Sequence, residues 1–142
     1  MMQKHNVQYV QVVLPLAVAG SFTYTLPPEF AEKVQVGSRV VVQFGTRRYY
    51  TGIVLDVLTE NPSPQSKLKS IADVVDNAPI LLTEQLKLWQ WIATYYMCTL
   101  GEVMKAALPS GLKLESETIL LRNADFEAEG AELSDRDRAI LH

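Results

Sequence analysis

The segment VQFGTRRYYTG holds the residues of the chain best suited to contact a charged ligand. Gly45 precedes two guanidiniums, Arg47 and Arg48, and two aromatic rings, Tyr49 and Tyr50, follow at once. Guanidiniums bind phosphate through charge-assisted hydrogen bonds and rings stack on bases, so this combination suits a nucleic-acid strand. A solvated β-hairpin turn explains the same glycine and charges, and the pattern by itself leaves both interpretations open.

The rest of the chain offers few residues for catalysis or metal binding. A single cysteine, Cys98, excludes an intramolecular disulfide, and with only two histidines, His5 and His142, no Cys/His metal set can be assembled. Apolar neighbours of Cys98 predict a buried, inert thiol. The sequence has no G-x-x-x-x-G-K-[ST] loop to cradle a nucleotide triphosphate. We therefore predict no catalytic residue, metal or cofactor in this chain.

The net charge of −3 is distributed unevenly. Residues 1–114 contain ten Lys/Arg and eight Asp/Glu, a balance of +2, and residues 115–142 contain three and eight, a balance of −5. A balance of +2 is compatible with a local basic patch but is too small to predict non-specific DNA binding. No apolar run is long enough to cross a bilayer and no secretory signal stands at the beginning, which predicts a cytoplasmic location without membrane contact.

Valine-rich or alternating segments predict five strands. In SFTYTL, Phe22, Tyr24 and Leu26 alternate with hydroxyl residues, so a period of two places the apolar set on one face. The five predicted strands lie within residues 7–16, 21–26, 34–44, 49–58 and 68–76. Turn residues separate them, and a polar loop with two prolines precedes the last one. This pattern predicts a small closed or half-closed β-barrel of the OB or SH3 kind.

Two helices are predicted after the strands. The first follows Thr83 as its N-cap, and the second begins with a capping box formed by Thr99 and Glu102. Apolar residues surround so much of the first helix that we expect packing on two sides, with both Trp89 and Trp91 in the core. The remaining residues do not complete a fold, so we infer a fragment cut inside a second domain.

Several of these segments, taken in order, resemble one known family. VVLPLAVAGSFTYTLP, VQVGSRVVVQFGTRRYYTGIV and WIATYYMCTLGEVMKAALPSGL resemble the N-terminal part of the bacterial primosomal replication-restart helicase PriA (primosomal protein N′). The resemblance implies a 3′-end DNA-binding domain over residues 1–112, and a linker with the incomplete start of a winged-helix domain over residues 113–142. The expected fold is mainly β with α: an OB/SH3-like barrel, a helical hairpin, and a truncated winged-helix-like segment.

The resemblance also implies a function and a site. Domains of this family bind the 3′ end of the nascent leading strand at stalled or abandoned forks, with little sequence preference. The matching pocket residues here are Phe22 as a stacking wall, Thr23, Gly45 for close backbone approach, and Lys69 for the terminal phosphate. The family usually has aspartate where Thr23 stands. A neutral hydroxyl predicts weaker holding of the end, or less discrimination against a blocked one.

Further expectations concern partners and the full-length protein. Charge and position predict that Arg47, Arg48 and Lys67 contact the DNA backbone. The resemblance implies an ATP-dependent 3′-to-5′ helicase whose ATP, magnesium and zinc sites lie in lobes outside this non-enzymatic fragment. It also implies forked DNA or a recessed 3′ end as ligand, with primosome and single-strand-binding proteins as partners of the full-length protein. The alternative is an SH3-like protein-interaction barrel without specific nucleic-acid binding.

Overall fold

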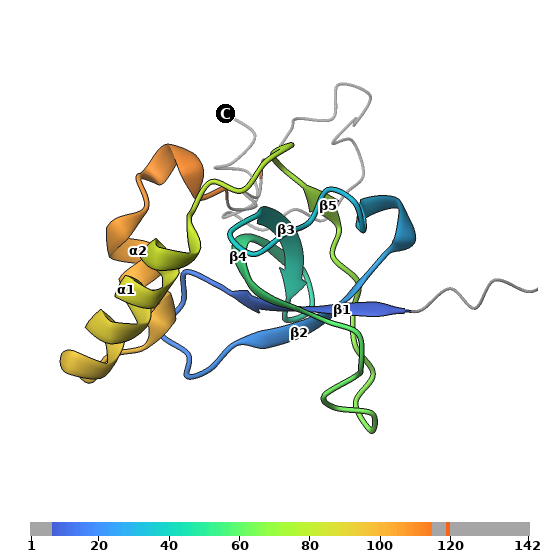
Figure 1. Cartoon of the computed structure of the whole chain (residues 1–142), viewed down its shortest axis with the longest axis horizontal. Helices are drawn as coiled ribbons and strands as arrows, with labels where there is room; N and C mark the ends of the chain where they lie inside the picture. The colour runs from blue at the N-terminus through green and yellow to red at the C-terminus, as the bar shows by residue number, and fades with distance from the viewer. Residues whose placement is uncertain (1–6, 115–118, 120–142) are drawn as a thin grey trace, which may run out of the picture.

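A computed structural model describes residues 7–114 and residue 119. The strands are β1 (Gln8–Val13), β2 (Phe22–Leu26), β3 (Arg39–Phe44), β4 (Arg48–Leu58) and β5 (Asp73–Val74), followed by α1 (Thr83–Tyr95) and α2 (Leu100–Ala107), with 3-10 turns at Pro28–Phe30 and Ser110–Leu112. The strands form one antiparallel sheet in the order β2-β1-β4-β3-β5, and the two helices lie together at one end of it (Figure 1). The predicted class, mainly β with α, is confirmed. The expected winged-helix start falls almost entirely outside the described residues.

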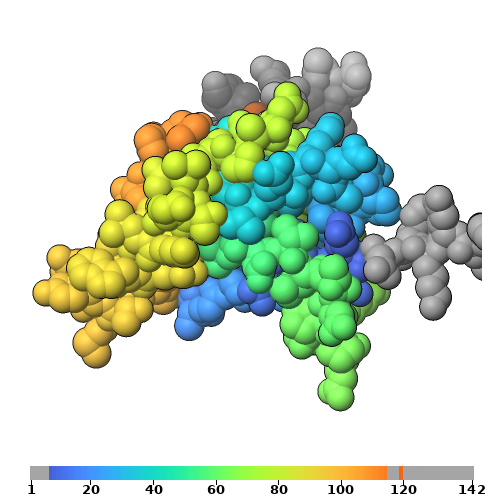
Figure 2. All heavy atoms as spheres, in the orientation of Figure 1, coloured from blue at the N-terminus to red at the C-terminus, as the bar shows by residue number. Residues whose placement is uncertain are grey.

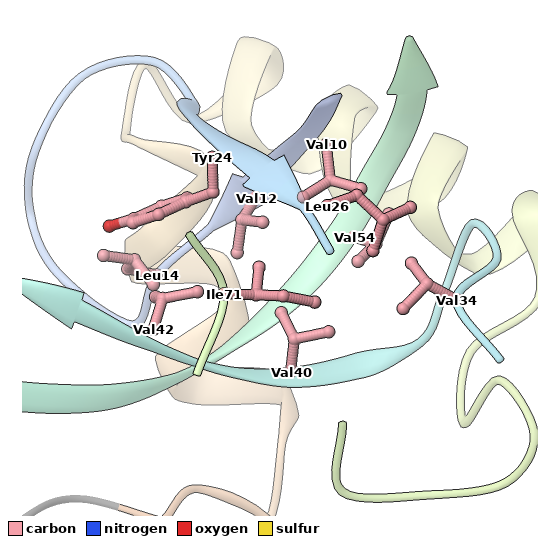
Figure 3. Close-up of a cluster of buried hydrophobic side chains, with 10 residues drawn as sticks. All are labelled: Val10, Val12, Leu14, Tyr24, Leu26, Val34, Val40, Val42, Val54 and Ile71. Atoms are coloured by element: carbon pink, nitrogen blue, oxygen red, sulfur yellow. The ribbon is translucent and has the colours of Figure 1, made fainter. Parts of the chain in front are cut away.

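The central strands are buried on both faces, which explains why they read as runs of valine. In β1, Val12 belongs to one core and its neighbour Val13 to another. The same division separates Val54 from Ile53 in β4. Figure 3 shows the first core, where side chains from the curled sheet point toward one another: Val10, Val12, Leu14, Tyr24, Leu26, Val34, Val40, Val42, Val54 and Ile71.

The second core joins the outer face of the sheet to the helices. It contains Val13, Ile53, Leu81, Leu86, Trp89, Val103, Met104 and Leu108. The helix α2 approaches the chain after β1 so closely that a Cβ at Gly101 would overlap the carbonyl oxygens of Leu14 and Leu16. Glycine at this position therefore allows the helical hairpin to pack against the segment that leads into β2.

The sheet is half-closed and does not form a complete barrel. Within the described residues, one isolated parallel bridge, Thr25 with Ser70, links β2 to the segment before β5. The backbone N–H of Thr25 donates to the carbonyl oxygen of Lys69 at 2.9 Å, and the N–H of Ile71 donates to the carbonyl oxygen of Thr25 at 3.1 Å. The next N–H, from Ala72, donates instead to β3, at 2.8 Å from the oxygen of Val41.

This change of partner shortens the fifth strand. The prediction of a strand across residues 68–76 was wrong in extent, because the segment contacts β2 first and β3 afterwards. Only Asp73 and Val74 form a ladder with β3. We call the gap between β2 and β3 the seam. Residues 69–71 close the seam at one point, through their backbone contacts with Thr25.

One of the two predicted helix caps is confirmed. The Oγ1 of Thr99 accepts from the N–H of Glu102 at 3.2 Å, and the Glu102 carboxylate accepts from the N–H of Thr99 at 2.8 Å. Hydrogen bonds from the backbone and side chain of Thr99 lower the pKa of Glu102. The N-cap of α1 is Leu82 and not Thr83, because the Gln85 side chain reaches back to accept from the Leu82 N–H at 2.8 Å.

The first helix packs on one side only within the described chain. Trp89 is buried at 6% exposure, whereas Trp91 is 58% exposed, so the prediction of two core tryptophans was wrong for Trp91. The Trp91 ring stacks on Tyr95 with a centroid separation of 5.0 Å. The outer face of α1 lies at the margin of the molecule (Figure 1), and no described element covers it.

Arginine and threonine side chains hold residues 112–114 against the sheet. Arg39 binds both carboxylate oxygens of Asp76, at 2.7 and 2.8 Å, and donates to the oxygen of Leu112 at 3.1 Å. The hydroxyl of buried Thr51 donates to the Leu114 oxygen at 2.8 Å. Residues 112–114 therefore remain bound to β3 and β4. The domain boundary expected after residue 112 stays a prediction.

The difference between the two tryptophans predicts different stability losses. Trp89→Ala should lower the free energy of unfolding by about 3–5 kcal/mol, because it empties a packed core position. Trp91→Ala should change it by only about 0.5 kcal/mol, because the ring is mainly exposed. Urea unfolding followed by circular dichroism measures both. Equal losses for the two variants would contradict the one-sided packing of α1.

Candidate nucleic-acid interface

A pocket of about 380 Å³ opens on the seam, beside the bridge between β2 and Ser70. Its walls come from the start of β2, the end of β3 and the loop between β4 and β5, which projects in green from the lower edge of the molecule (Figure 2). The lining residues are Ser21, Phe22, Thr23, Tyr24, Gln43, Phe44, Gly45, Ser63, Ser66, Lys67, Leu68 and Lys69. The pocket thus contains all four predicted pocket residues.

Aromatic contacts across the seam hold the pocket walls together. The ring of Phe22 on β2 meets that of Phe44 on β3 edge to face, with centroids 4.8 Å apart. The Tyr24 hydroxyl donates to the carbonyl oxygen of Gln43 at 3.0 Å. Burial raises the pKa of Tyr24 to about 12. Tyr50 packs behind Phe44 at 6.3 Å, so one of the two hairpin rings supports the wall.

Gly45 and Lys69 meet directly in the pocket. The Lys69 ammonium donates to the Gly45 carbonyl oxygen at 2.6 Å. Gly45 has φ +76°, a conformation that residues with a side chain rarely adopt, and the space that its Cβ would occupy is open. The Gln43 amide donates to the oxygen of Thr46 at 2.7 Å and fixes the turn. An ammonium has three donors, and among the described residues only the Gly45 oxygen accepts from Lys69, which leaves two donors for an anion.

Hydroxyl groups supply most of the remaining polar lining. Thr23 is half-buried and lies on the opposite face of β2 from Phe22, as the alternation predicts. Ser63 and Ser66 come from the loop, and the sequence analysis did not identify them. The prolines and polar residues around Ser63 and Ser66 predicted a loop, but they did not indicate which side of the loop faces β2.

The hairpin arginines lie beside the pocket and not in its lining. Arg47 is exposed in the turn, and Arg48 is the first residue of β4, paired with Phe44. The turn therefore contains three residues, one fewer than predicted. Lys67, predicted as a backbone contact, lines the pocket itself. The DNA-binding roles of these residues stay predictions.

Other candidate chemistry is limited in the part of the chain that the structure describes. Among residues 7–114 and 119, no three His, Cys, Asp or Glu side chains converge to hold a metal. None of the helices there has the length and apolar character needed to span a membrane. Cys98 lies between α1 and α2 and is half-buried, so it is less enclosed than predicted.

Known proteins match most of the described chain. Residues 11–109 fit the family model of the PriA 3′ DNA-binding domain (3′BD), and this range includes the whole pocket. The chain belongs to the PriA 3′ DNA-binding domain family. The sequence resemblance to PriA is therefore confirmed.

Full-length PriA proteins show the same relationship. The replication restart protein PriA of Haemophilus influenzae is 36% identical over 104 residues, covering 73% of this chain and 14% of that protein. The Synechocystis PriA protein is 36% identical over 108 residues, which cover 75% of this chain and 12% of that protein. The Bacillus subtilis PriA protein is 26% identical over 123 residues, which cover 85% of this chain and 15% of that protein. The chain thus spans about a seventh of the length of the PriA proteins it matches.

Tyr24 makes the stability of this PriA domain dependent on alkaline pH. Its folded pKa of about 12 exceeds the value of about 10 for an unfolded tyrosine, so the neutral phenol favours folding. That contribution is complete below pH 10 and is lost as the pH rises toward 12. We expect the stability of the wild type, relative to Tyr24→Phe, to fall by up to about 1.4 kcal/mol per pH unit in this window. Urea titrations at several pH values measure it, and a constant difference would contradict the burial of this phenol.

Proposed function

We propose that this chain binds the 3′ end of a DNA strand in the seam pocket, with little sequence preference. In the cell the ligand is the nascent leading strand at a stalled or abandoned replication fork. The observation that carries the proposal is the convergence of Phe22, Thr23, Gly45 and Lys69 in one pocket, in a chain of the PriA 3′ DNA-binding domain family.

The dimensions of the pocket favour a terminal nucleotide over the middle of a duplex. Its volume of about 380 Å³ lies near the small end of the range of about 300–1,000 Å³ for small-molecule sites. The half-buried Phe22 ring, braced by Phe44, offers an apolar wall for a base or sugar. The open space beside Gly45 leaves room for the sugar to approach the backbone.

Two features support binding without strong sequence preference. Lys67 and Lys69 offer charge to phosphates, which all nucleotides share. The side-chain nitrogen of Gln43, an amide suited to reading a base edge, already donates to Thr46. Arg47 and Arg48, exposed on the same hairpin, would contact phosphates farther from the end.

The surrounding functions belong to the rest of a full-length PriA protein. We propose that ATP, magnesium and zinc bind in helicase lobes outside this chain, which itself binds DNA and does not unwind it. We further propose a cytoplasmic location and contacts with primosome and single-strand-binding proteins through the full-length protein. The family relationship supports these proposals.

Fluorescence anisotropy with two DNAs of the same sequence tests end binding. One is a hairpin with a 5′ overhang and a recessed 3′-hydroxyl, and the other is a closed dumbbell without a terminus. We expect tighter binding of the recessed end. Lys69→Ala should weaken it about tenfold, as expected for a charged hydrogen bond to phosphate. Gly45→Asp should also weaken it, because it places a carboxylate beside the pocket at a strained φ.

Lys87→Ala is the matched control, since it removes an exposed lysine on α1 that does not line the pocket. It should leave the preference for the recessed end unchanged. Equal affinity for the hairpin and the dumbbell would contradict end binding. Failure to bind either DNA would favour the protein-interaction alternative.

A further inference from the structure

The charge of the pocket lining bears on which DNA ends the pocket accepts, an inference that rests on the proposed function. Of its twelve lining residues, only Lys67 and Lys69 are charged, and both are cationic. Thr23 supplies a hydroxyl that can donate as well as accept. A pocket with this lining provides donors and positive charge, which are the requirements for holding a phosphate group.

The donors reach the pocket from both sides. On one side the Lys69 ammonium donates to the Gly45 oxygen at 2.6 Å, and its other two donors have no partner within the described part of the chain. On the loop side, Lys67 and the hydroxyls of Ser63 and Ser66 have no hydrogen-bond partner among the described residues. Thr23 lines the same pocket from β2.

The loop that carries these donors is constrained. The Ser63 N–H donates to the side chain of Asn61 at 2.8 Å, and the Ser66 N–H donates to the oxygen of Ser63 at 3.0 Å. Pro62 and Pro64 fix two further φ angles within the same turn. The hydroxyls and Lys67 are therefore presented by a folded turn, and they lose less conformational freedom when an anion binds.

We propose that this pocket accepts a DNA 3′ end that carries a terminal phosphate at least as tightly as an end with a free 3′-hydroxyl, and that Thr23 determines this tolerance. A 3′-phosphate adds negative charge where the lysines and hydroxyls converge, so binding it gains charge-assisted hydrogen bonds. A carboxylate at the position of Thr23 would repel the phosphate and would instead accept a hydrogen bond from a free 3′-hydroxyl.

Anisotropy with two hairpins that differ only in their recessed end, 3′-hydroxyl or 3′-phosphate, tests the proposal. The wild type should bind the phosphate end with equal or lower Kd. Thr23→Asp should weaken binding of the phosphate end by about tenfold or more and leave the hydroxyl end within about twofold. Thr23→Ser keeps the hydroxyl and should behave as the wild type. Circular dichroism confirms that each variant is folded before binding is compared.

Two results would overturn the inference. One is a wild type that binds the phosphate end about tenfold more weakly than the hydroxyl end. The other is a folded Thr23→Asp variant with no change in its preference between the two ends. The closed dumbbell separates this failure from that of the proposed function. A wild type that prefers the free 3′-hydroxyl end over the dumbbell but rejects the phosphate end refutes only this inference, whereas equal binding of all three DNAs refutes end binding itself.

Discussion

The pocket depends on a short backbone contact that closes the seam of the sheet. Residues 69–71 bind Thr25 of β2, and the next residues bind β3. This contact brings the segment with Lys67 and Lys69 beside Phe22, which is more than forty residues away in the sequence. The seam stays open where β2 begins and β3 ends, and the opening forms the pocket.

Two hydrophobic cores make the surroundings of this opening rigid. Strands β1 and β4 contribute side chains to both cores, so neither strand can shift without disturbing both faces. The edge strand β2 has less support, and the Tyr24 hydroxyl and the Phe22–Phe44 contact tie it to β3. The pocket-lining groups of β2 and β3 therefore stand on fixed strands, with one turned loop opposite them, an arrangement that would suit the proposed recognition of a small terminal group.

Sequence pattern predicted the parts of the fold that depend on local periodicity. Alternation in SFTYTL placed Tyr24 and Leu26 on one face of a strand, and both are buried; the pairing of Thr99 with Glu102 correctly predicted the start of α2. The fifth strand was predicted too long because alternation does not reveal a change of hydrogen-bond partner at Ala72. Trp91 was misplaced because helical spacing cannot tell whether a second apolar face is covered.

The residues that line the pocket were predicted to a similar degree, while their binding roles stay predictions. The resemblance to PriA selected Phe22, Thr23, Gly45 and Lys69, and the structure brings all four to one pocket. Ser63 and Ser66 were missed because a loop without periodicity carries no information about which side faces the pocket. Arg47 and Arg48 do not line the pocket, because of the direction in which the hairpin between β3 and β4 projects. The composition of the sequence does not specify this direction.

Backbone amide NMR during titration with a DNA hairpin that has a recessed 3′ end tests the central claim most directly. The account predicts that the signals that shift belong to residues 21–24, 43–46 and 63–69, around the seam pocket. Shifts confined to the exposed outer face of α1, around Trp91 and Tyr95, would contradict it, because DNA would then bind away from the pocket.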